Sequence, residues 1–218
     1  MHSWNSYQLE LTKGNVMSVY GQGTLTVKPD RVIISIGIKT ENAAVILALT
    51  ENAQRAQQVI QALKSIGIKD DDIDTSSFSI YPKYDYSDGK STVVGYEVEH
   101  IFNITVKDVQ KAGSIYETAV SNGANIARGI QFQLTTPEYY YQHALADALR
   151  NAQEKATVLA RTLGIPFNSI PVKVIEEKIA PVEPLYSPTA TVLSEQSGPP
   201  IHSQDIIIKA TVKAVFEY

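Results

Sequence analysis

Residues 31–40 read RVIISIGIKT, and this stretch decides the fold class because its apolar side chains recur at every second position. Val32, Ile34, Ile36 and Ile38 fall on one side of an extended chain, with small or polar residues between them. A period of two is typical of a β-strand that buries one face. We therefore expect a strand here and a layer of helix packed against its apolar side.

The neighbouring segments supply a second strand and that helix. Residues 16–30 are rich in β-branched residues, carry Gly21 and Gly23 as expected bends, and end at Pro29-Asp30. From about Asn42 the apolar period lengthens to three or four residues, which predicts an amphipathic helix ending at Gly67. Its expected apolar stripe is Leu49, Ala53, Ala56, Ile60 and Leu63.

The middle of the chain predicts a β-hairpin. A strand is expected around Phe78 to Tyr84, a turn at residues 87–90 (SDGK), and a long strand from Val93 to Val106. The long strand should present one face made by alternate residues. These are Tyr96, Val98, His100, Phe102, Ile104 and Val106.

The second half of the chain alternates helices and strands. Asp108 can cap a short helix that stops at Asn122-Gly123, and a strand follows at residues 130–134. Thr136, Pro137 and Glu138 are the expected cap, first-turn proline and first-turn acid of an alanine-striped helix reaching Leu163. Strands at 171–176 and 205–218 complete the predicted order β-β-α-β-β-α-β-α-β-β. The fold class is α+β, with mixed, mainly antiparallel sheets packed against helices.

Composition limits the classes of function. The chain has 218 residues, 44% hydrophobic and 19% charged, which fits a soluble globular protein of one large domain or two small ones. The net charge of −4 and the lack of a Lys/Arg cluster argue against a nucleic-acid partner. No apolar run approaches the roughly 18 residues of a spanning helix. The absence of cysteine excludes disulfides and thiolate chemistry.

Two segments carry no periodic pattern. Residues 1–15 are polar, lack the zones of a signal peptide, and are expected to form a flexible arm. Residues 179–204 contain five prolines and are expected to form a mobile loop within a domain spanning 16–218.

No motif predicts a catalytic, cofactor or metal site. Gly21-Gln22-Gly23 lacks the third glycine and the following helix of a dinucleotide loop. The aspartates at 70, 72 and 74 have calcium-loop spacing, but Thr75 and Tyr81 stand where that loop needs Gly and Glu. Ser87 and Lys90 have the spacing of a serine-lysine pair but fall in the predicted turn.

The histidines at 2, 100, 143 and 202 are far apart in sequence, so no local spacing predicts a metal site. His100 stands on an otherwise apolar strand face and is expected to be packed. A ligand or a proton-linked switch is the alternative.

Aromatic residues flank the predicted hairpin. Tyr81, Tyr84, Tyr86 and Tyr96 flank the turn, and such clusters without basic neighbours more often pack in a core or a protein interface than stack bases or sugars. The last strand adds Ile207 and Val215 on the side opposite its expected core face. These six residues are the candidate interface.

Five stretches in order resemble the SIMPL-domain family, over roughly Val16 to Ile175 and the last strand. They are VYGQGTLTVKPDRVIISIGI, ENAQRAQQVIQALKSIGIKDDDIDTSSFSIYPKYDY, GYEVEHIFNITVKD, SNGANIARGIQF and ALRNAQEKATVLARTLGI. The resemblance implies an α+β fold and no established enzyme activity. For bacterial relatives it implies mostly periplasmic or surface proteins, some forming ring-like oligomers and some linked to stress tolerance. An animal relative is a signalling adaptor.

The resulting expectation is a non-enzymatic structural or interaction protein that forms homo-oligomers or binds another protein. The alternative is a small-ligand-binding module that uses the tyrosine-rich hairpin, with the proline-rich loop as a lid. A periplasmic or cell-surface location follows from the resemblance alone. Because no leader is visible in this sequence, the cytoplasm is the alternative location.

Overall fold

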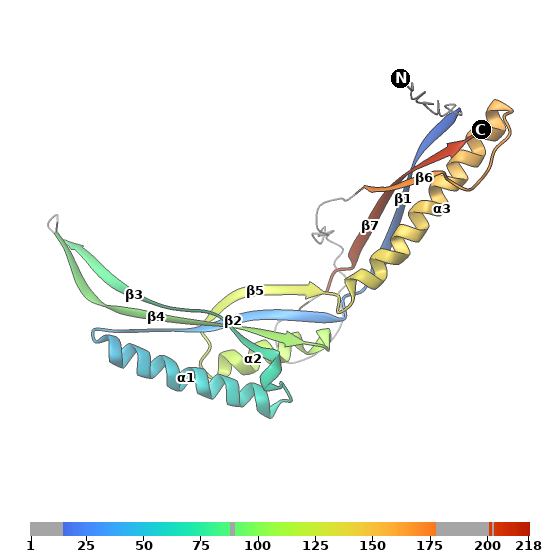
Figure 1. Cartoon of the computed structure of the whole chain (residues 1–218). Helices are drawn as coiled ribbons and strands as arrows, with labels where there is room; N and C mark the ends of the chain where they lie inside the picture. Colours follow the sequence, from blue (N-terminus) through green and yellow to red (C-terminus); the bar gives the residue numbers. More distant parts are fainter. Residues whose placement is uncertain (1–14, 88–89, 178–200, 202) are drawn as a thin grey trace, which may run out of the picture. The chain divides into compact units, whose positions relative to one another are not determined.

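The computed structural model describes residues 15–87, 90–177, 201 and 203–218. These residues form two compact units, shown in Figure 1. The central unit contains residues 28–135 and the described part of 186–206, and the terminal unit contains the described part of 1–27, 136–185 and 207–218. The expected arm at 1–15 and proline-rich loop at 179–204 lie almost wholly outside the described residues.

The predicted order of elements is confirmed. The central unit holds a four-stranded antiparallel sheet in the order β3-β4-β2-β5, with two helices on one face. Two short 3₁₀ turns, at Asp70–Asp72 and Val109–Lys111, precede β3 and α2. The elements of the central unit are β2 Arg31–Asn42, α1 Val45–Ser65, β3 Ile73–Ser87, β4 Lys90–Val106, α2 Ala112–Ser121 and β5 Ile126–Gln133.

The core of the central unit lies between the sheet and its two helices. Val32, Ile34, Ile36 and Ile38 are all fully buried, as their alternation predicts. Asp108 begins the short helical segment before α2, and its carboxylate accepts a hydrogen bond from the Gln110 backbone N–H at 3.1 Å.

The buried stripe of α1 is rotated about the helix axis relative to the predicted stripe, so the prediction was wrong in part. The buried residues are Ala48, Asn52, Ala56, Val59 and Leu63, whereas the expected Leu49, Ala53 and Ile60 are not buried. The reason is a polar residue in the core. Asn52 Nδ2 donates hydrogen bonds to the backbone carbonyls of Ile38, at 3.0 Å, and Val98, at 3.2 Å.

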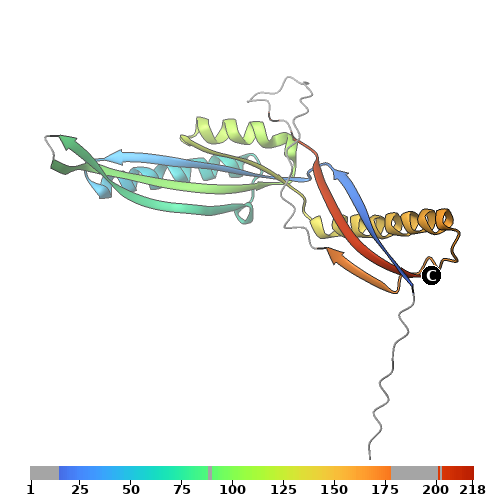
Figure 2. The same ribbon diagram turned by 90° about the horizontal axis from the view of Figure 1, so that it is seen from above.

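The terminal unit packs one long helix on a three-stranded sheet. The strand order is β1-β7-β6, and α3 covers one face, as Figure 2 shows. The buried stripe of α3 consists of five alanines, in agreement with its predicted small-residue face. The elements are β1 Val16–Val27, α3 Pro137–Leu163, β6 Lys173–Glu177 and β7 Ile206–Glu217.

The glycines of β1 allow this helix to approach. A Cβ on Gly21 would lie 1.9 Å from the Ala148 carbonyl oxygen, and one on Gly23 would lie 1.9 Å from that of Ala144. They therefore serve close helix-to-strand packing rather than the predicted bends. Thr136 precedes α3 as expected, but its side chain makes no capping hydrogen bond.

Candidate interaction surface

The β3–β4 hairpin has one apolar side that is exposed. Across the two strands Phe78 faces His100, Ile80 faces Val98 and, after an irregularity, Tyr84 faces Val93. Residues that face each other across antiparallel strands share a side of the sheet, and alternate residues of one strand do too. We call Phe78, Ile80, Tyr84, Tyr86 and Val93 the hairpin apolar face; these side chains are between 41% and 77% exposed.

The outer part of the hairpin apolar face, Tyr84, Tyr86 and Val93, is bare because α1 does not extend under it. Phe78 and Ile80 are exposed because β3 is the edge strand of the sheet. Asn42 pairs with Tyr96, and α1 begins three residues later at Val45. The hairpin continues past this point toward Ser87 and Lys90, beyond the start of α1 in Figure 1. Ile46 and Leu47 in the first turn of α1 are also exposed. Solvent-exposed apolar side chains therefore cluster at one end of the central unit.

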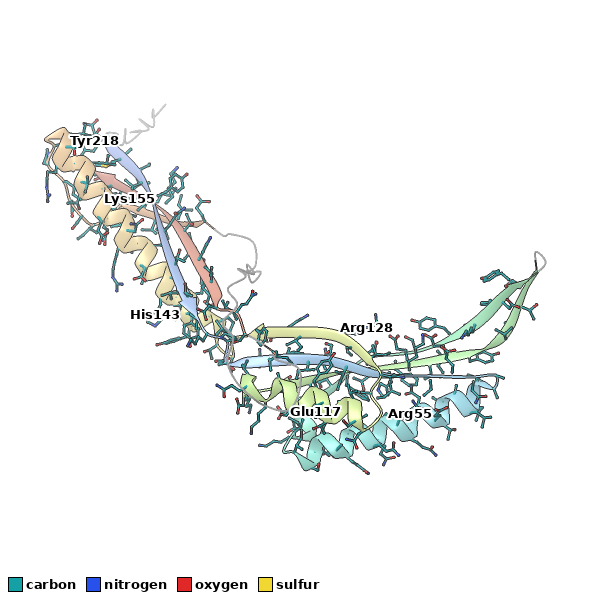
Figure 3. All side chains as sticks on the ribbon, turned by 180° about the vertical axis from the view of Figure 1, so that it is seen from behind. Arg55, Glu117, Arg128, His143, Lys155 and Tyr218 are labelled. Carbon is teal, nitrogen blue, oxygen red and sulfur yellow. The ribbon has the colours of Figure 1, made fainter. Side chains whose placement is uncertain are left out.

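The opposite side of the hairpin is polar and carries several ion pairs. Lys83 pairs with Glu41, and Lys39 Nζ lies 2.6 Å from Glu97 Oε2. The Lys83 ammonium lowers the pKa of the Glu41 carboxyl through their hydrogen bond. Arg128 of β5 (Figure 3) pairs with a further carboxylate of this side, Glu99, at 2.6 Å. This side is a solvent face, and the hairpin is thus amphipathic.

The six predicted interface residues divide among three surfaces. Tyr84 and Tyr86 belong to the hairpin apolar face, with ring centroids 6.3 Å apart, and Tyr96 is partly buried on the same side. Tyr81 alternates with them and lies on the polar side. Ile207 and Val215 are partly buried on the side of β7 away from α3, in the terminal unit.

Three members of the hairpin apolar face were not predicted from the sequence: Phe78, Ile80 and Val93. The signal was present in FSIYPKYDY, where positions 78, 80, 82, 84 and 86 are Phe, Ile, Pro, Tyr and Tyr. That alternation would have separated Tyr81 from Tyr84 and Tyr86.

His100 lies where the bare hairpin meets the covered core. Its ring makes an edge contact with Phe78, centroids 5.0 Å apart, and contacts Phe102 at 4.1 Å. Its Nε2 lies 3.1 Å from the Thr75 hydroxyl. Burial lowers the pKa of the His100 imidazole. The ring is therefore placed as a packed aromatic residue that favours the neutral form.

A second aromatic group lies at the start of α3. Tyr139 contacts the rings of Tyr140 and His143, the latter labelled in Figure 3. The Tyr141 hydroxyl donates a 2.7 Å hydrogen bond to Glu176 Oε1 in β6, and this bond raises the pKa of Tyr141 to about 12. The Glu176 carboxylate is thus engaged by a phenol from α3.

An open groove of about 550 Å³ lies between β1 and α3, away from the predicted tyrosine hairpin. Lys155 Nζ donates to the Tyr20 carbonyl across it at 3.0 Å, and the Gln22 backbone N–H donates to Asn151 Oδ1 at 3.2 Å. Its lining residues are Ser18, Val19, Tyr20, Asn151, Glu154, Lys155, Val158 and Leu159.

Within the described ranges no three His, Asp or Glu side chains come together in a way that could hold a metal ion. No helix in that part of the chain is both long and apolar enough to cross a membrane. Exposed apolar patches are typical of interaction sites, and the hairpin apolar face is the candidate interaction surface of the described residues.

Fold and surface together define a two-unit α+β protein with an amphipathic hairpin. The SIMPL family model, described as a protein of unknown function (DUF541), matches residues 17–216. The chain therefore belongs to the SIMPL family.

Several curated bacterial proteins are similar to it. The "26 kDa periplasmic immunogenic protein" of Brucella melitensis is 28% identical over 159 residues, which cover 71% of this chain and 64% of the Brucella protein. "Uncharacterized protein YggE" of Escherichia coli K12 is 26% identical over 191 residues, 86% of this chain and 77% of its own length. YggE of Edwardsiella ictaluri is 24% identical over 211 residues, 95% and 88% of the two chains. The chain thus spans less than two thirds of the Brucella relative.

Proposed function

We propose that this SIMPL protein is a non-enzymatic structural or interaction protein that assembles with copies of itself through the hairpin apolar face. The observation that carries the proposal is the contrast between the two sides of one hairpin. On one side Phe78, Ile80, Tyr84 and Tyr86 are exposed, and on the other Lys83 and its neighbours form ion pairs. A solvated hairpin has no physical need for such an apolar side.

The composition of the face favours a protein partner. Tyrosine and phenylalanine are enriched at protein interfaces, where their rings bury large apolar areas and a phenol keeps a polar contact. Strand β3 is also an edge strand, so its outer backbone groups are open to pairing. A second copy that covers both features would bury aromatic rings and extend the sheet in one contact.

A second contact is proposed on the open side of β7, where Ile207 and Val215 lie. Lys209 and Lys213 lie between them on the same side of β7, the central strand of its sheet, and oppose nonspecific association because burying their charges is costly. We expect this surface to contribute less than the hairpin apolar face.

The location proposed with this function is the periplasm or the cell surface, with the cytoplasm as the alternative. It is supported by the name of the Brucella relative, which is called periplasmic. Fractionation of cells expressing the native gene tests it, and recovery in the cytoplasmic fraction would contradict it.

The test of assembly is the mass in solution, measured by light scattering over a range of concentrations. We expect wild type to exceed the 23.9 kDa of one chain at tens of micromolar. Tyr84→Ser with Tyr86→Ser should lower that mass, whereas Tyr81→Ser, which removes the same ring from the polar side, should not. Ile207→Lys with Val215→Lys tests the second contact separately.

A strictly monomeric wild type at tens of micromolar would overturn the assembly proposal. That result would favour the small-ligand alternative, which a thermal-shift screen against metabolites would then address. Equal effects of the Tyr81 and the Tyr84–Tyr86 variants would overturn the assignment of the interface to one side of the hairpin.

A further inference from the structure

The two edges of the terminal sheet differ in how their backbone groups are used. At the β1 edge, side chains of α3 bond to the strand: Lys155 to the Tyr20 carbonyl and Asn151 to the Gln22 N–H. Covering an edge in this way blocks the addition of another strand. The β1 edge is therefore partly closed.

The opposite edge, β6, is open in the part of the chain that the structure describes. All five of its residues, Lys173–Glu177, are exposed, and among the described residues no side chain bonds to their backbone. Exposed apolar residues, Ile170, Val172 and Val174, lie on or just before it. The charged Lys173 and Glu177 oppose pairing with most strands, so a strand that adds to this edge has to present complementary charges at these positions.

The sequence of β6, KVIEE, complements itself. Two copies of β6 can run antiparallel to each other about a two-fold axis perpendicular to the sheet. Each residue of one copy then faces a residue of the other copy, and the two side chains lie on the same side of the sheet. With the axis at Ile175, Lys173 faces Glu177 of the second copy and Ile175 faces Ile175 of the second copy. Axes at Lys173 or Glu177 would instead place like charges opposite each other, which is destabilising.

We infer that β6 pairs with β6 of a second copy about this axis, making one six-stranded sheet in the order β1-β7-β6-β6-β7-β1. The contact is isologous, so the same patch serves both partners. It deepens the proposed self-assembly but uses the terminal unit, whereas the hairpin apolar face belongs to the central unit.

The contact is a modest one. Stable interfaces bury about 1,200–2,000 Å² in total, and five paired residues fall short of that. Exposed Lys–Glu pairs mainly set register rather than strength. The pairing should therefore depend strongly on concentration.

Cysteine scanning tests the register directly because the chain has no cysteine. Facing side chains have Cβ atoms about 4.5–5.5 Å apart, within reach of a disulfide after small adjustment. Ile175→Cys should give a disulfide-linked dimer on mild oxidation. Glu177→Cys is the matched control, because the two copies of residue 177 would lie about four residues apart along the strands, roughly 13 Å.

Both cysteine variants are made in the Tyr84→Ser, Tyr86→Ser background, so that the yield reports β6 and not the hairpin. Preferential crosslinking at 175 supports the pairing even if the hairpin proposal fails. Equal or lower yield at 175 than at 177 would overturn it, whatever the mass of the wild type.

Charge exchange, read out through the Ile175→Cys crosslink, gives a second test of the register. Lys173→Glu should weaken β6 pairing roughly threefold to tenfold, since it places carboxylates opposite each other. Adding Glu177→Lys to the same chain should restore it, because the pair is then only reversed. Failure of the double variant to recover crosslinking through Ile175→Cys would overturn the proposed register.

Discussion

One side of the central sheet has a part that α1 covers and a part that it leaves bare. Apolar residues alternate along the strands in both parts, but they are buried in the first and exposed in the second. Under α1, the alternate residues Ile34, Ile36 and Ile38 are fully buried. Past the start of α1, Tyr84 and Tyr86 continue the same side of the sheet on the hairpin and remain exposed. A period of two tells which residues share a side, but the extent of the neighbouring helix decides which of them become core.

The largest expected effect is on the covered part. Ile36→Ala should lower the free energy of unfolding by about 2–5 kcal/mol, because it leaves a cavity at a fully buried site. Tyr84→Ser on the bare part should change it by about 0.5 kcal/mol or less in the monomer. Urea denaturation at low protein concentration measures both, and similar losses would remove the distinction between core and interface.

An intermediate effect is expected from the buried amide that orients α1. Asn52→Ala should cost about 1–3 kcal/mol, because the Ile38 and Val98 carbonyls lose their donor. Gln57→Ala removes an amide from the exposed side of the same helix and is the control. If the two variants unfold at the same urea concentration, Asn52 does not orient the helix as described.

The smallest effect concerns His100, at the boundary between the two parts. Because burial lowers its pKa from the ordinary 6.5, the unfolded chain takes up the proton first as the pH falls. The contribution is thus present above about pH 6.5 and is lost as the pH drops below that value. His100→Phe should reduce the loss of stability between pH 7 and 5.5. If His100→Phe leaves the pH dependence of the free energy of unfolding unchanged, burial does not lower the pKa of the His100 imidazole as described.

Local patterns in the sequence predicted the elements well. Alternation at residues 32–38 placed the buried strand, and the alanines of 144–156 placed the buried stripe of α3. Both depend on spacing within one element. The rotation of α1 was not predictable in this way, because the position of Asn52 depends on two carbonyls from distant strands.

The candidate surface was predicted only in part for the same reason. Tyrosines near the turn indicated the hairpin, but grouping by proximity placed Tyr81 with Tyr84 although they lie on opposite sides. Whether a side is bare depends on where α1 begins relative to the hairpin, and that follows from the register that pairs Asn42 with Tyr96, which a pattern within one element does not give. The open edge at β6 likewise follows from the strand order β1-β7-β6, which no local pattern specifies.

The most direct test of the central claim is tyrosine labelling of the wild-type protein, resolved by residue with mass spectrometry at low and high protein concentration. Assembly through the hairpin apolar face predicts that labelling of Tyr84 and Tyr86 falls as concentration rises, while Tyr81 stays reactive. Labelling of all three that does not change with concentration, in a protein that is folded at both, would contradict the account.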